Sequence, residues 1–197
     1  MKLYERLPDR ARAGGRTYKL DLDFRNVLQY MEILSRDDLL PDAREYLALR
    51  KLTKRPPKQL SKLTEAIKGL LFPETKKPAE HKKLTDFAQD ADLIRAAFRQ
   101  SYGIDLWRDK LHWIEFSALL NALPEGSRYS EVLGIRARPI PAATKYNKAE
   151  RDWLIKAKAQ CALTKSDKEI EDAYTAGVLS AFRGMMSMIK GGDNSDG

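Results

Sequence analysis

FRQSYGIDLWRDKLHWIEFSALLNAL, residues 98–123, contains the large side chains on which we expect the fold to be built. Phe98 and Tyr102 fall at helical spacing before a glycine that is placed to end a helix, and Trp113 and Phe116 begin a second run of the same period. Large aromatic side chains bury readily between helices. The stretch therefore predicts an aromatic helix-turn-helix, in which two antiparallel helices enclose these four side chains.

Caps and breakers predict where the helices outside this stretch begin and end. Asp23 is predicted to cap a helix that starts at Phe24, and Pro41 to lie in the first turn of the next helix. Asp86 and Asp109 are predicted to cap the two helices of the aromatic stretch. The apolar stripes expected to be buried are Phe24, Val27, Leu28, Met31 and Leu34; Tyr46, Leu47, Leu49 and Leu52; Leu60, Leu63, Ile67, Leu70 and Leu71; and Phe87, Ala91, Ile94, Ala97 and Phe98.

A strand is predicted near the N-terminus, where apolar and polar residues alternate over residues 17–24. Gly14 and Gly15 precede it and indicate a turn. We expect the strand to pair with residues in the range 1–7 as a hairpin. A lone hairpin is only marginally stable, so it should lie against the helices.

Three further helices are expected in the C-terminal half. A short one is predicted at residues 130–134. Asn147 followed by Glu150 resembles a capping box and starts a helix that runs to about residue 163. A long amphipathic helix over residues 167–190 follows Ser166 and ends before a polar, disordered tail.

The fold class predicted from these patterns is mainly α: a compact helical bundle with a short N-terminal β-hairpin and a long C-terminal helix. We expect a helical domain over residues 1–163, and the amphipathic helix with its tail over residues 164–197.

Composition limits the function classes. No run of about 18 apolar residues is present, so no membrane span is expected. The single cysteine, Cys161, permits no intramolecular disulfide and fits a reducing compartment. The formal net charge of +8 favours acidic partners or nucleic acid, but basic and acidic residues are mixed in every segment, which disfavours nucleic acid.

No residues are arranged in a pattern typical of catalysis or of metal binding. His81 and His112 are far apart, and one cysteine cannot complete a zinc site. Asp21 and Asp23 are spaced like the start of a calcium loop that lacks its glycine and its final glutamate. We therefore expect a binding protein with no catalytic residues, no metal and no cofactor, and not an enzyme.

A series of short features extends over most of residues 1–163. They are Leu7-Pro8, Gly14-Gly15, Tyr18, Asp23-Phe24-Arg25, Phe98, YGIDL at 102–106, His112-Trp113, Phe116, Arg136 before Ile140-Pro141, and the charged helix at 150–163. In these features the sequence resembles a bacteriophage family of tail proteins named after gene product fifteen. The middle block, Phe98 to Phe116, carries the most specific part of the resemblance. Members usually carry a second aromatic residue after His-Trp, where this chain has Ile114.

What the resemblance implies is a tail assembly chaperone of a siphophage. Such a protein would bind the phage tape-measure protein in the host cytoplasm, keep it soluble, help the major tail protein polymerise around it, and be absent from the mature virion. Two alternatives stay open: a structural component of the tail, and a basic adaptor that binds nucleic acid.

The predicted helix over residues 167–190 is a candidate for binding the partner. Its apolar stripe is accompanied by small residues that let another helix approach, and methionines adapt to varied partners. Packing on the protein's own core, self-association and contact with a membrane surface are the other roles that such a stripe can have. The residues of this candidate surface are Ile170, Tyr174, Val178, Phe182, Met185, Met186 and Ile189.

Overall fold

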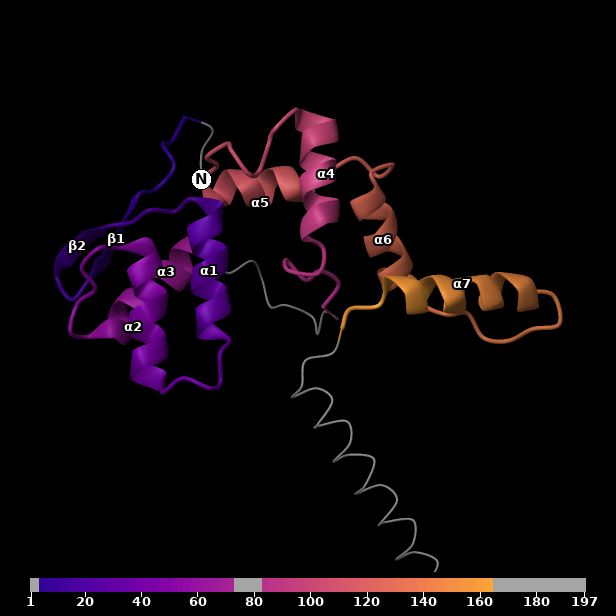
Figure 1. Ribbon diagram of the computed structural model, residues 1–197, viewed down its shortest axis with the longest axis horizontal. Helices are drawn as coiled ribbons and strands as arrows, with labels where there is room; N and C mark the ends of the chain where they lie inside the picture. The colour runs from indigo at the N-terminus through magenta and orange to yellow at the C-terminus, as the bar shows by residue number, and fades with distance from the viewer. Residues whose placement is uncertain (1–3, 73–82, 165–197) are drawn as a thin grey trace, which may run out of the picture. The chain divides into compact units, whose positions relative to one another are not determined.

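The computed structural model describes residues 4–72 and 83–164. It confirms a mainly helical fold with an antiparallel N-terminal hairpin: in the described residues, two strands are followed by seven helices (Figure 1). The chain divides into two units, Met1–Cys161 and Ala162–Gly197, and all the elements belong to the first. The helix predicted for residues 167–190 lies outside the described residues, and the boundary expected after residue 163 stays a prediction.

The hairpin consists of β1 (Arg10–Ala13) and β2 (Arg16–Lys19). Gly14 and Gly15 form the turn, with φ of +56° and +75°. Two consecutive positive φ angles are typical of the tight two-residue turns whose twist matches that of paired strands.

The predicted partner strand within residues 1–7 is wrong, because a two-residue turn pairs the residues directly beside it. The predicted strand over residues 17–24 also ends early. After the Leu20 amide donates to the Asp9 carbonyl over 2.7 Å, the chain leaves the ladder.

The next three helices are α1 (Phe24–Leu34), α2 (Pro41–Leu52) and α3 (Leu60–Leu71), with α1 and α2 packed along each other (Figure 1). The Asp23 carboxylate accepts from the amide of the second helical residue, and Pro41 lies in the first turn of α2, both as predicted. The stripe predicted for α2 is partly wrong. Tyr46 and Leu47 are nearly half exposed because Ala48 faces the core instead.

The second half contains α4 (Ala91–Tyr102), α5 (Trp113–Asn121), α6 (Arg128–Ala137) and α7 (Lys148–Cys161). Gly103 ends α4 with φ of +69°, as its placement predicts.

Two predicted caps are wrong, because local turns use the carboxylates. Asp86 accepts from the Ala88 and Gln89 amides in a turn that precedes α4. Asp109 accepts from the Asp105 amide, and the cap of α5 is His112. The expected capping box before α7 does not form either, since the side-chain Oδ1 of Asn147 accepts from the Thr144 amide.

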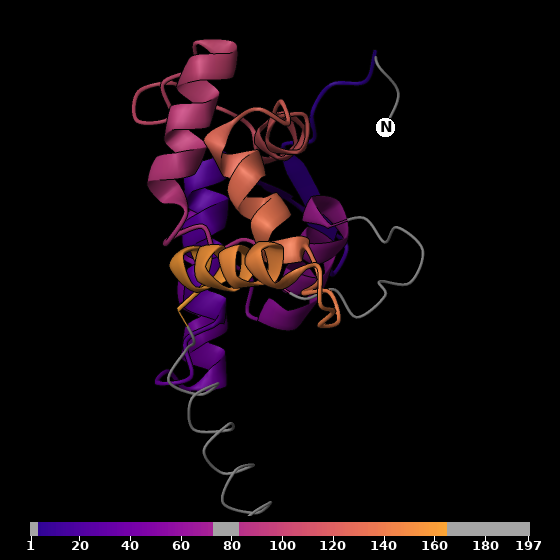
Figure 2. The same ribbon diagram turned by 90° about the vertical axis from the view of Figure 1, so that its right-hand side faces the viewer.

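The core is centred on Phe116, whose ring stacks on three others. The ring centroid lies 4.7 Å from that of Phe24, 5.3 Å from that of Phe98 and 5.8 Å from that of Trp113. These four residues are buried, and Tyr102 is partly buried against Phe98. Figures 1 and 2 show α4 and α5 crossing steeply, so the predicted antiparallel arrangement of these two helices is wrong.

Candidate functional site

The seven residues proposed from sequence as the partner surface lie outside the described residues. They are Ile170, Tyr174, Val178, Phe182, Met185, Met186 and Ile189. In the part of the chain that the structure describes, exposed apolar side chains are the candidates for a partner-binding surface. Among the large ones, Trp107 is 71% exposed and borders a hollow in the surface.

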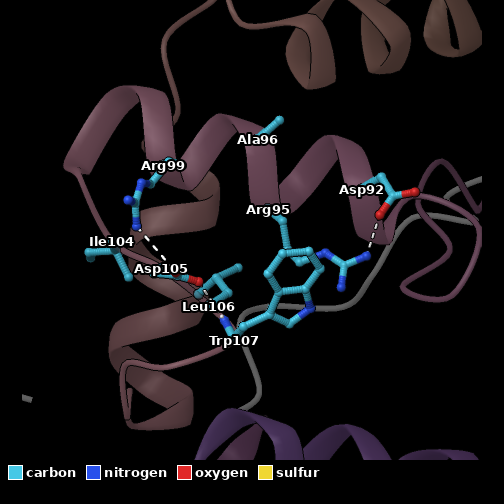
Figure 3. Close-up of a pocket in the computed structure, with 8 residues that line it drawn as sticks. All are labelled: Asp92, Arg95, Ala96, Arg99, Ile104, Asp105, Leu106 and Trp107. Carbon is cyan, nitrogen blue, oxygen red and sulfur yellow. Dashed lines mark hydrogen bonds and ion pairs between the residues drawn. The ribbon is translucent and has the colours of Figure 1, made fainter.

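The hollow has a volume of about 400 Å³ and lies between the outer side of α4 and the segment that follows it (Figure 3). We call it the Trp107 surface. Figure 3 shows the Trp107 ring lying beside Arg95, which reaches toward it from α4. The residues that line the Trp107 surface are Asp92, Arg95, Ala96, Arg99, Ile104, Asp105, Leu106 and Trp107.

The backbone that presents Trp107 is fixed by hydrogen bonds from both sides. Its amide donates to the Asp105 carboxylate over 3.1 Å, and its carbonyl accepts from the Arg25 guanidinium over 3.2 Å. Asp105 is held in turn by Asp109, whose carboxylate accepts from the Asp105 amide over 2.8 Å. The indole is therefore held out from an ordered turn, which reduces the ordering cost of binding a partner.

The local sequence explains why this tryptophan faces outward. Gly103 ends α4, and the chain then turns back toward the core, where Leu106 is buried. Trp107 comes directly after it and falls on the opposite side. The exposed indole contributes little to the core and is free to contact a partner.

Two ion pairs border the ring. The Arg95 guanidinium lies 4.5 Å from the Trp107 ring centroid and pairs with Asp92. Arg99 pairs with Asp105 over 3.1 Å. The surface thus offers an apolar ring beside arginines, a combination enriched at the centres of protein interfaces.

His112 and Asp23 have structural roles at the start of α5 and α1. The His112 Nδ1 accepts from the Ile114 amide over 3.2 Å, so Nε2 is the donor to the Pro8 carbonyl, 3.0 Å away. Asp23 and His112 form an antiparallel bridge that joins the two helix starts. Burial alone would raise the pKa of Asp23, but hydrogen bonds from the Arg25 side chain and amide outweigh it and lower the pKa.

Sequence reasoning missed a buried ion pair between α4 and α6. Arg136 donates twice to Asp90, over 2.7 and 2.8 Å, and their side chains are only 8% and 1% exposed. Arg136 also donates to the carbonyls of Leu84 and Cys161. The hydrogen bond to Asp90 raises the pKa of Arg136. The pair holds elements together rather than facing a ligand.

Cys161 and His81 are the other residues that the sequence offers for metal binding or catalysis. The Cys161 thiol is partly buried, and His81 lies outside the described residues. Within residues 4–72 and 83–164, no group of three or more histidine, cysteine and carboxylate side chains is placed to hold a metal ion. None of the helices in those ranges is long and apolar enough to span a bilayer.

Comparison with known proteins gives one match. The family model described as bacteriophage Gp15 protein matches residues 3–163, which include every described helix and both strands. No curated protein and no solved structure matches the chain.

Proposed function

The chain belongs to the bacteriophage Gp15 protein family, and from that premise we propose that it is a tail assembly chaperone that binds the tape-measure protein. It acts by binding and not as an enzyme. It works in the host cytoplasm, keeps the tape measure soluble, promotes polymerisation of the tail tube and does not stay in the virion. The major tail protein and a second copy of the chain are further partners in this proposal.

The Trp107 surface is the observation that carries this proposal. A tape measure is a long helical protein with apolar stripes, which aggregate unless they are covered. A chaperone has to cover such stripes reversibly, and a helix that lies in a groove does so through apolar residues spaced three or four apart. An exposed indole on a hydrogen-bonded turn, beside a hollow, suits this kind of contact.

The sequence pattern from Ile170 to Ile189 supports the same proposal independently of the structure. Its apolar residues recur at helical spacing beside several methionines, which adapt to different partners. A client with many stripes along its length suits a protein with more than one apolar surface.

Co-expression with the tape-measure protein of the same phage tests the function. We expect the tape measure to be insoluble alone, and soluble and co-purified when the chain is present. Trp107→Ala should reduce the co-purified amount by about tenfold, as for an interface hot spot. Tyr46→Ala, which removes a nearly half-exposed aromatic ring from α2, is the matched control and should change nothing.

Two results would contradict the proposal. One is a tape measure that stays insoluble and unbound in the presence of the wild-type chain. The other is detection of the chain by mass spectrometry in purified virions at the copy number of a structural component, which would favour the alternative of a tail protein.

A further inference from the structure

Helix α7 is attached to the rest of its unit by one side only. Its contacts with other elements are made mainly with α6, and Leu154 is the buried residue of the helix. The sides adjacent to Leu154 add polar contacts, in which Lys158 donates to the Arg136 carbonyl and Arg138 pairs with Glu150. The remainder of the helix surface faces outward.

We call the residues that point away from Leu154 the outer face of α7. With 3.6 residues per turn, they span nearly half of the helix circumference. Every one of them is exposed, including the large side chains of Trp153 (55%) and Ile155 (43%). The outer face consists of Lys148, Ala149, Asp152, Trp153, Ile155, Lys156, Ala159 and Gln160.

Large and small side chains are arranged on this face so that another helix fits along it. By the helical rotation, Trp153 and Ile155 fall at its two edges. Ala149 and Ala159 fall between those edges, toward opposite ends of the helix. Asp152 and Lys156 fall at the centre of the face with an alanine on either side of them. A second helix therefore meets small side chains beside a charged centre and is flanked by Trp153 and Ile155.

The charges around α7 favour an acidic partner. Residues 138–161 contain six basic residues and two acidic ones, and one of the acidic residues, Glu150, is paired with Arg138. Along the outer face, Lys148, Asp152 and Lys156 follow one another at intervals of four. The two lysines are about 12 Å apart along the helix axis, so the complementary partner carries two carboxylates separated by two helical turns.

We propose that the outer face of α7 binds an acidic amphipathic helix of the tape-measure protein, an inference that rests on the proposed function. A protein helix fits better than nucleic acid. Phosphate binding needs basic residues along the whole face, whereas here two alanines and two large apolar residues make up half of it and Asp152 separates the lysines.

Binding of overlapping tape-measure fragments to the full chain, measured by fluorescence anisotropy, tests the inference. We expect acidic helical fragments to bind and Trp153→Ala to weaken them about tenfold. The double variant Lys148→Glu with Lys156→Glu should weaken them similarly and make binding less sensitive to salt. Circular dichroism should show all the variants folded, because the changed residues are exposed.

Matched controls isolate the face from general effects of charge and of aromatic loss. Lys51→Glu with Lys62→Glu changes the net charge equally on α2 and α3, and Tyr46→Ala removes an exposed ring elsewhere. Both controls should bind within twofold of the wild type. Replacing two fragment carboxylates, spaced by two turns, with lysine should restore binding to the α7 charge variant.

The outcomes separate the inference from the proposed function. If the wild type binds fragments and the α7 variants bind equally well, the inference fails and the function stands. If the wild type binds no fragment, the function fails, and the inference with it. If the charge variant loses only binding to a labelled 20-base-pair DNA duplex, the face is a nucleic-acid surface and the inference is overturned.

Discussion

Asp90→Ala is expected to lower the free energy of unfolding by about 3–5 kcal/mol, because it leaves a buried guanidinium without its counter-charge. The Asp90 side chain is 1% exposed and that of Arg136 is 8% exposed, so water cannot replace the lost carboxylate easily. The variant removes two of the four hydrogen bonds that Arg136 makes and also the acceptor of the Asp86 amide.

The double variant Asp90→Ala with Arg136→Met should be less destabilised than the sum of the two single variants. Each single change leaves one charge buried and unpaired, whereas the double change leaves neither. The carbonyls of Leu84 and Cys161 still lose their donor, so we expect a residual cost. The difference between the double variant and the sum is the coupling energy of the pair.

Urea unfolding at pH 7, followed by far-ultraviolet circular dichroism, measures all four proteins of this cycle. Asp38→Ala is the control: its ion pair with Arg36 is more than half exposed on both sides, and we expect no measurable change. The reasoning that the pair is shielded from water and energetically coupled would be refuted by either of two results. One is a loss of unfolding free energy below about 1 kcal/mol for Asp90→Ala, and the other is strict additivity of the two single variants.

Three other perturbations address the hairpin and the helix starts. Gly15→Ala should destabilise the fold by about 1–2 kcal/mol in thermal unfolding because φ is positive there, whereas Gly14→Asn should be nearly neutral; equal effects would argue against the turn type. The pKa of Asp23 is lowered, so its contribution to stability is present above its ordinary pKa of 3.8 and is lost as the pH falls through the lower folded-state value. Asp23→Asn keeps a capping side chain but should reduce the loss of unfolding free energy at acidic pH. An unchanged loss would exclude the ion pair between Asp23 and Arg25 as its source. His112→Ala should cost about 1–2 kcal/mol through the lost cap of α5, and His112→Asn less; a larger loss with asparagine would contradict the capping role.

The sequence predicts those features of the fold that depend on neighbouring residues. Asp23, Pro41 and Gly103 lie where their chemistry indicates, because a cap, a first-turn proline and a left-handed glycine each act within one turn. Asp86 and Asp109 are the instructive errors. An aspartate accepts amide hydrogen bonds in a helix cap and in a non-helical turn alike, so its presence alone does not distinguish the two.

Features that join distant parts of the chain could not be predicted in the same way. Asp90 precedes α4 and Arg136 lies in α6, and each has the appearance of an ordinary surface charge in the sequence. The steep crossing of α4 and α5 brings together rings from three helices around Phe116, an arrangement that spacing along either helix does not specify.

The three tryptophans show why the candidate surfaces also needed the structure. Trp113 falls in a clear apolar period and is buried. Trp107 lies in a segment without a period, and Trp153 lies in a helix with only one buried residue, so no pattern shows which way either indole points. Their exposure is a property of the assembled unit.

The residues that stabilise the unit are different from those that form its two candidate surfaces. The stacked rings and the Asp90–Arg136 pair are buried, whereas the Trp107 and Trp153 rings lie outside the core. Removing either exposed indole leaves the buried contacts in place, so the fold does not depend on them. Loss of binding without loss of stability is therefore the outcome that identifies a partner surface in this protein, and a variant that loses both reports on the core.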